Sequence, residues 1–187
     1  MEKDDLEKRA ADLLHNHDVD ATDGFDIVVL AQKMGFVVGN AKLADDEDGL
    51  IAVDKSKDSL FNTSSNMVIL VNRNRDYYFK RFIVAHELGH YMLEGNGKQI
   101  YAHRKNKTGE RSENEQEVDY FAANLLMPKD EFTSKYYEIV KSSTVIYEIA
   151  DKLSKVFQTP MESIYRRLEE LGLLQNCAPE AGQANGQ

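Results

Sequence analysis

The sequence of 187 residues contains a single cysteine, Cys177, and that cysteine lies in a polar stretch near the C-terminus. One cysteine cannot form an internal disulfide, and it cannot supply the thiolates that a cysteine-based zinc site needs. Such low use of cysteine is typical of proteins in a reducing compartment. We therefore expect a cytoplasmic protein whose chemistry does not depend on thiols.

Other features that would indicate export or membrane insertion are also missing. Residues 1–9 mix acidic and basic side chains, so they do not have the basic-then-apolar profile of a signal peptide. No apolar run approaches the roughly 20 residues that a membrane-spanning helix requires. We see no internal repeat, and no low-complexity block precedes the C-terminal tail.

The sequence also lacks an excess of positive charge. It has 23 Lys and Arg residues against 32 Asp and Glu residues, which gives a formal net charge of −9. The pI calculated from the sequence is about 5.1. Proteins that bind nucleic acid through its phosphates need basic surfaces, so direct nucleic-acid binding is not expected.

The composition is that of an ordinary globular protein, with 42% hydrophobic and 29% charged residues. Helical spacing of apolar residues and turn residues predicts helices near 2–17, 24–34, 77–93, 113–127, 130–141, 143–157 and 160–171. For the second helix, Asp20, Thr22 or Asp23 is the candidate N-cap. Short apolar runs predict strands near 36–38, 50–53 and 67–71. We therefore expect an α+β fold, mostly helical, with a small sheet of about three strands.

The most informative stretch is Val84-Ala85-His86-Glu87-Leu88-Gly89-His90, which contains an H-E-x-x-H motif. On a helix, residues four apart share one face, so His86 and His90 can supply two ligands to one tetrahedral zinc ion. Glu87 would then lie beside the metal, where it can act as a catalytic base. The alternative is an amphipathic helix with two partly buried histidines.

A catalytic zinc site needs a third protein ligand, and the helix expected at 113–127 offers Glu115, Glu117 and Asp119. Glu115 borders the apolar stripe of this helix and shares a side with Asp119. This arrangement predicts that Glu115 reaches the metal while Asp119 accepts the second N–H of a zinc-bound histidine. Alternatively, these acids form a solvated face near a helix N-terminus, and for Glu117 we favour that interpretation.

The two segments RFIVAHELGHYMLE and ENEQEVDYFAANLLMP together resemble the ImmA/IrrE family of metallopeptidases. The resemblance extends over roughly residues 1–173 and implies a zincin-like peptidase core, here 1–128. The predicted core is followed by a helical subdomain, 129–173, which resembles a helix-turn-helix and is expected to pack on the core. A disordered tail, 174–187, completes the predicted organisation.

The resemblance implies that His86, His90 and Glu115 hold zinc and that Glu87 is the catalytic base. It also implies a protein substrate, typically a helix-turn-helix repressor of stress, phage or mobile-element genes. Val118 departs from the family, which often has Ala there, and a further His found in many members after the motif is missing from YMLEGN. Because many members carry an N-terminal helix-turn-helix domain that has no room here, we expect the stand-alone form.

Three residues in the polar stretch 98–114, Tyr101, His103 and Arg104, are candidates for stabilising the oxyanion or contacting substrate. The alternative, which we favour for each of them, is an ordinary loop residue. The strand near 67–71 is a candidate sheet edge for binding an extended substrate.

Some questions stay open at this point. The same ligands can hold manganese or iron. The protein could also be a regulatory module that binds metal without cutting, or a DNA-binding regulator using Lys152, Lys155, Arg166 and Arg167. The oligomeric state is not specified by the sequence.

Overall fold

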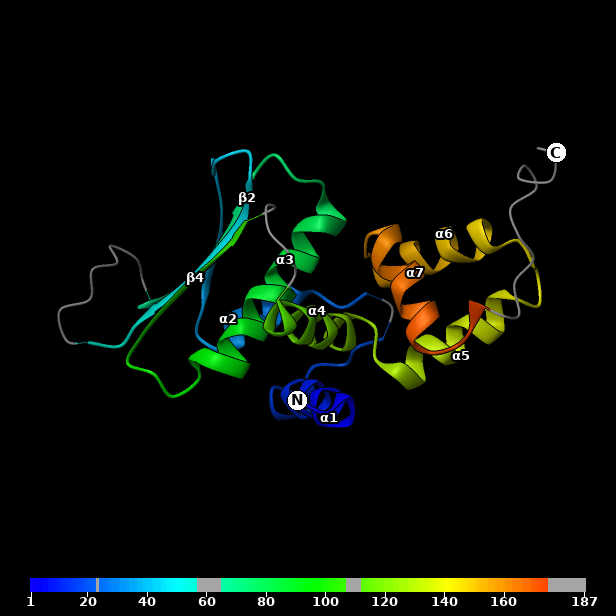
Figure 1. Ribbon diagram of the computed structural model, residues 1–187, viewed down its shortest axis with the longest axis horizontal. Coiled ribbons are helices and arrows are strands. Elements are labelled where there is room, and N and C mark those ends of the chain that lie inside the picture. The colour runs from blue at the N-terminus through cyan, green and yellow to red at the C-terminus, as the bar shows by residue number, and fades with distance from the viewer. Residues whose placement is uncertain (23, 57–64, 107–111, 175–187) are drawn as a thin grey trace.

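The computed structural model describes residues 1–22, 24–56, 65–106 and 112–174. Within these residues the chain forms seven α-helices and one four-stranded mixed sheet, which confirms the predicted α+β class (Figure 1). The helices are α1 (Lys3–Asn16), α2 (Ile27–Lys33), α3 (Tyr77–His90), α4 (Glu113–Leu126), α5 (Lys129–Ile139), α6 (Ile146–Phe157) and α7 (Met161–Glu170). The strands are β1 (Val37–Ala41), β2 (Glu47–Asp54), β3 (Met67–Asn72) and β4 (Ile100–Asn106).

The sheet has the order β1-β3-β2-β4, so β3 lies inside it. One side of β3 pairs in parallel with β1, and the other pairs antiparallel with β2. Our hypothesis that the strand near 67–71 forms a sheet edge for substrate was therefore wrong. Its backbone groups are used on both sides, which is consistent with the continuous apolar run Met67-Val68-Ile69-Leu70-Val71.

The small sheet, expected to have about three strands, has four, because the polar stretch 98–114 also contains β4. This strand pairs antiparallel with β2, and Ile51 lies opposite His103. Side chains that alternate along a strand point to opposite faces, so Tyr101 and His103 share one face. The strand has few apolar residues to reveal it in the sequence. Its backbone is fixed by the long partner β2.

The second helix begins later than predicted, because its N-cap is Asp26 and not Asp20 or Thr22. The Asp26 carboxylate accepts a hydrogen bond from Val28 N–H at 2.9 Å. Asp20 instead accepts one from Thr22 N–H, at 3.1 Å, in the preceding turn. The third candidate, Asp23, lies outside the described residues.

Helix α3 occupies the centre of the molecule between the sheet and α4 (Figure 1). Two glycines permit this close packing. A Cβ on Gly49 of β2 would lie 2.4 Å from Ile83 Cγ2 on α3. A Cβ on Gly89 of α3 would lie 3.1 Å from Val118 Cγ1 on α4. Because neither glycine has a side chain, β2, α3 and α4 can pack closely against one another.

Beyond α4, helices α5, α6 and α7 gather on the side of the molecule away from the sheet (Figure 1). They are joined to the rest by one hydrophobic core and by polar contacts, including Arg167 Nη2 donating to Asn124 Oδ1 at 2.6 Å. The division at residue 128 stays a prediction. Apart from Leu174, the expected tail and Cys177 lie outside the described residues.

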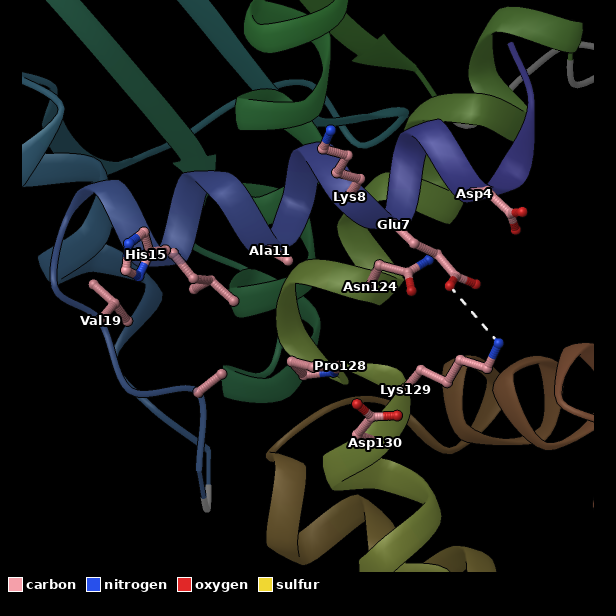
Figure 2. Close-up of a pocket in the computed structure, with 12 residues that line it drawn as sticks. Asp4, Glu7, Lys8, Ala11, His15, Val19, Asn124, Pro128, Lys129 and Asp130 are labelled. Carbon is pink, nitrogen blue, oxygen red and sulfur yellow. Dashed lines mark ion pairs between the residues drawn. The ribbon is translucent and has the colours of Figure 1, made fainter.

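Helix α1 lies along α4 and leaves a cavity of about 560 Å³ beside the α4–α5 junction (Figure 2). Lys129 and Glu7 form an ion pair across it at 3.9 Å. Its walls carry charges of both signs, and the residues lining it do not include those of the H-E-x-x-H motif. None of the helices in the described ranges is long and apolar enough to cross a membrane.

Candidate active site

Helix α3 brings His86 and His90 together. It begins at Asp76, whose carboxylate accepts a hydrogen bond from Phe79 N–H at 3.0 Å, and it carries the motif in its last two turns. Both histidines are buried, and their Nε2 atoms lie 3.0 Å apart. The i, i+4 spacing therefore places both nitrogens at one point, as the sequence predicted.

Helix α4 adds Glu115 at the same point. Its Oε1 lies 3.1 Å from His90 Nε2, and its Oε2 lies 3.4 Å from His86 Nε2. The hydroxyl of Ser112 fixes the start of α4 by accepting a hydrogen bond from Glu115 N–H at 3.3 Å. Glu117 is turned elsewhere, because its carboxylate pairs with the amino group of Met1.

A carboxylate lies behind each motif histidine. Asp119 Oδ1 is 2.8 Å from His86 Nδ1, the pairing anticipated in the sequence, and Arg166 of α7 lies 3.4 Å from the other oxygen of Asp119. Glu94 Oε1 is 2.6 Å from His90 Nδ1. Sequence reasoning missed Glu94, although its spacing of four residues from His90 was the available signal.

These contacts make the centre suitable for a cation. Carboxylates accept hydrogen bonds, so the Nδ1 atoms of both histidines donate and their Nε2 atoms carry lone pairs. Two lone pairs and the Glu115 carboxylate then converge, with separations close to the ~3.3 Å expected between ligands about 2.0–2.1 Å from a tetrahedral ion. His103, together with the adjoining imidazoles of His86 and His90, holds the pKa of Glu115 far below its usual value, so the carboxylate is ionised. In the described residues, His86, His90 and Glu115 form the group that could bind a metal.

Glu87 lies beside this centre and is fully buried. One of its oxygens, Oε2, is 3.2 Å from His103 Nδ1. The other, Oε1, has no hydrogen-bond partner in the described structure. A buried carboxylate oxygen without a protein partner is costly, and such an oxygen is consistent with a catalytic role.

His103 connects β4 to the centre. In addition to Glu87, it approaches Glu115 Oε1, at 3.5 Å from its Nε2, and its ring stacks on His90 with centroids 3.5 Å apart. Burial lowers the pKa of His103, but hydrogen bonds to Glu115 and Glu87 outweigh burial and raise it to about 9. His103 is therefore a cation held between two carboxylates.

Tyr101 lies two residues before His103 and packs against Gly95, where a Cβ would meet its ring at 2.8 Å. Its hydroxyl is buried and has no hydrogen-bond partner in the described residues. Burial, followed by the charges of Glu94, Glu87 and Glu115, raises the pKa of Tyr101, so the phenol stays protonated. Arg104 lies in β4, but its side chain is outside the described part of the structure.

The Arg residues proposed for DNA contact are engaged within the protein. Arg167 is fully buried and bonded to Asn124, and Arg166 lies against Asp119 and Glu162. This pairing removes two of the four cations on which the DNA-binding alternative relied.

Comparison with known families gives a match to the peptidase M78 model, described as the IrrE N-terminal-like domain, over residues 24–169. A search of curated proteins found no match. The matched region covers more than half of the chain and includes both helices that carry the candidate metal ligands, α3 and α4. The protein therefore belongs to the IrrE N-terminal-like peptidase family, and this membership supports a metallopeptidase of the ImmA/IrrE type.

Proposed function

We propose that this protein is a zinc-dependent endopeptidase in which His86, His90 and Glu115 hold the metal and Glu87 is the catalytic base. The observation that carries this proposal is the convergence of His86 Nε2, His90 Nε2 and the Glu115 carboxylate at one point, while the Nδ1 atom of each histidine faces another carboxylate. Manganese and iron suit the same ligands and are the alternative metals.

When bound, zinc supplies a Lewis acid that polarises the scissile carbonyl and lowers the pKa of water. The chain supplies the proton transfers. The free Oε1 of Glu87 accepts a proton from the attacking water and later returns it to the leaving amine. Because Glu87 is fully buried, few other groups compete for that proton.

His103 has the role of orienting Glu87. Its Nδ1–H donates to Oε2, which leaves Oε1 directed away from that bond and available for chemistry. Tyr101 and Arg104 are the further candidates for contacting the substrate or the developing oxyanion.

The substrate is a protein segment in extended conformation. In the described structure β4 is an outer strand of the sheet, and it carries His103. An extended peptide pairing with β4 would pass beside Glu87 and Glu115, since His103 touches both. The resemblance to ImmA/IrrE peptidases makes a helix-turn-helix repressor our proposed substrate, cut in an exposed loop to relieve repression.

The metal ligands are tested by measuring zinc content and zinc affinity of purified variants. His86→Ala, His90→Ala and Glu115→Ala are expected to lose zinc. The matched control is Glu117→Ala on the same helix, which should bind zinc as the unmodified protein does because its carboxylate faces Met1. Loss of zinc in the Glu117 variant, with retention in the Glu115 variant, would show that the ligand choice is wrong.

Catalysis is tested by incubating the zinc-loaded protein with the helix-turn-helix repressor encoded beside it. We expect one new cleavage site, and we expect Glu87→Gln to slow cutting by about 10²–10⁴-fold while zinc stays bound. A repressor that stays intact under all metal conditions would favour the non-cleaving regulatory module instead. Equal cutting by the Glu87→Gln variant would exclude Glu87 as the base.

A further inference from the structure

The two motif histidines are supported differently. Asp119, behind His86, is almost fully buried, and its second oxygen faces Arg166. Glu94, behind His90, is about one-third exposed, and no arginine or lysine of the described residues forms an ion pair with its carboxylate. The Glu94 carboxylate that contacts His90 therefore needs an anchor other than an arginine such as the one that faces Asp119.

The backbone places Glu94 just after α3. The helix changes at His90 into the π-helical turn η1 (Tyr91–Gly95), and Glu94 lies one turn beyond His90 in the sequence. Gly95 closes this turn against the Tyr101 ring, which a Cβ would overlap at 2.8 Å. Single π-helical turns of this kind are frequent at functional sites.

Asn114 supplies the missing anchor. Its Nδ2 donates to Glu94 Oε1 at 2.8 Å, and Oε1 is the same oxygen that lies 2.6 Å from His90 Nδ1. Asn114 is next to Glu115 in α4, so one helix turn supplies both a proposed metal ligand and the residue that holds Glu94. The contact thus joins η1 to the start of α4.

We propose that Glu94, anchored by Asn114, is a positioning residue that fixes the tautomer and ring orientation of His90 for metal binding. The proposal rests on the proposed metal centre. With the proton held on Nδ1, the lone pair of Nε2 points at Glu115 and His86, where a metal would be bound. A carboxylate partner also makes the imidazole a stronger ligand.

The test compares Glu94→Ala, Glu94→Gln and Asn114→Ala by two measurements. The first is the nitrogen NMR signals of His90 in the metal-free protein at mildly alkaline pH, which report where the ring proton resides. We expect a single Nδ1–H tautomer in the unmodified protein and a mixture in Glu94→Ala. Glu94→Gln keeps an acceptor oxygen and should largely restore the Nδ1–H form.

The second measurement is zinc affinity by competition with a chelator. Glu94→Ala should weaken zinc binding by about 10–100-fold, and Asn114→Ala should fall between that variant and the unmodified protein. The matched control is Glu113→Gln, an exposed acid in the same first turn of α4, which should change neither measurement. Circular dichroism melting confirms that each variant is folded, and Asn114 is exposed enough for its variant to serve if the Glu94 variants do not fold.

Unchanged His90 signals and unchanged zinc affinity in Glu94→Ala would overturn the proposal. That result would leave the metal centre intact, because the unmodified protein would still bind zinc. Failure of the unmodified protein to bind any metal would instead remove the proposed function. The tautomer measurement needs no metal, so the two failures are distinguishable.

Discussion

The residues around the candidate metal site differ in how well the sequence alone predicts their roles. Asp119 shares a helix side with Glu115, so its position behind a histidine follows from helical geometry. The role of Glu94 could be recognised only once the path of the chain after α3 was known. On a regular surface helix, a histidine and a glutamate four residues apart would form only an exposed pair. His103 required knowledge that a polar stretch becomes a strand beside α3.

The Asp119 carboxylate is expected to strengthen metal binding through His86. Asp119→Asn keeps an oxygen for the Nδ1–H of His86 but removes the negative charge, so zinc affinity should fall by about 10–100-fold. Chelator competition measures this change. Arg166→Ala, which leaves the Asp119–His86 contact in place, should have a smaller effect, and an equal or larger effect of Arg166→Ala would contradict this order.

At the scale of elements, the close approach of α3 to β2 decides where Glu87 lies. A Cβ on Gly49 would contact Ile83 and would also lie 3.3 Å from Glu87 Oε1. The absence of a side chain there lets the helix approach the sheet and leaves space beside the catalytic oxygen. The register of the β2–β4 pairing shifts between Glu47 and Gly49, at the same place.

Gly49→Ala should therefore destabilise the fold and disturb the base. We expect the free energy of unfolding, measured with urea, to fall by about 1–3 kcal/mol because the new methyl overlaps a branched side chain that cannot easily turn. The matched control is Gly39→Ala in β1, where a Cβ would meet only the Leu70 Cδ2 methyl at 3.2 Å. A loss in Gly39→Ala as large as that in Gly49→Ala would rule out this explanation.

Helix and strand periodicity predicted most elements because their apolar positions repeat regularly. The motif helix and α4 carry such patterns, whereas the interior strand β3 was predicted from a continuous apolar run. The pattern failed for β4, whose residues take their strand conformation from pairing with β2. It also could not give strand order, because a buried run such as β3 reads the same at an edge or in the centre until its neighbours are known.

For the whole molecule, the proposed metal should contribute to stability. A ligand that binds only the folded state adds about 2.7 kcal/mol when present at 100 times its Kd. For a chain of 187 residues this corresponds to a rise in Tm of roughly 5–10 °C.

Scanning calorimetry with zinc and with a chelator measures this difference. His86→Ala and His90→Ala should abolish it, because each removes a proposed ligand. A zinc-dependent rise that persists in both variants would place the stabilising ion elsewhere on the protein.

The two helices that carry the proposed metal ligands, α3 and α4, are separated in the chain by β4, and His90 and Glu115 are 25 positions apart. An ion bridging them would tie a loop closed in a protein whose single cysteine cannot form an internal cross-link. That loop carries Tyr101 and His103, so loading and unloading of the ion would tighten or loosen the strand proposed to receive the substrate. Starvation for metal would then weaken capture of the target as well as its cleavage.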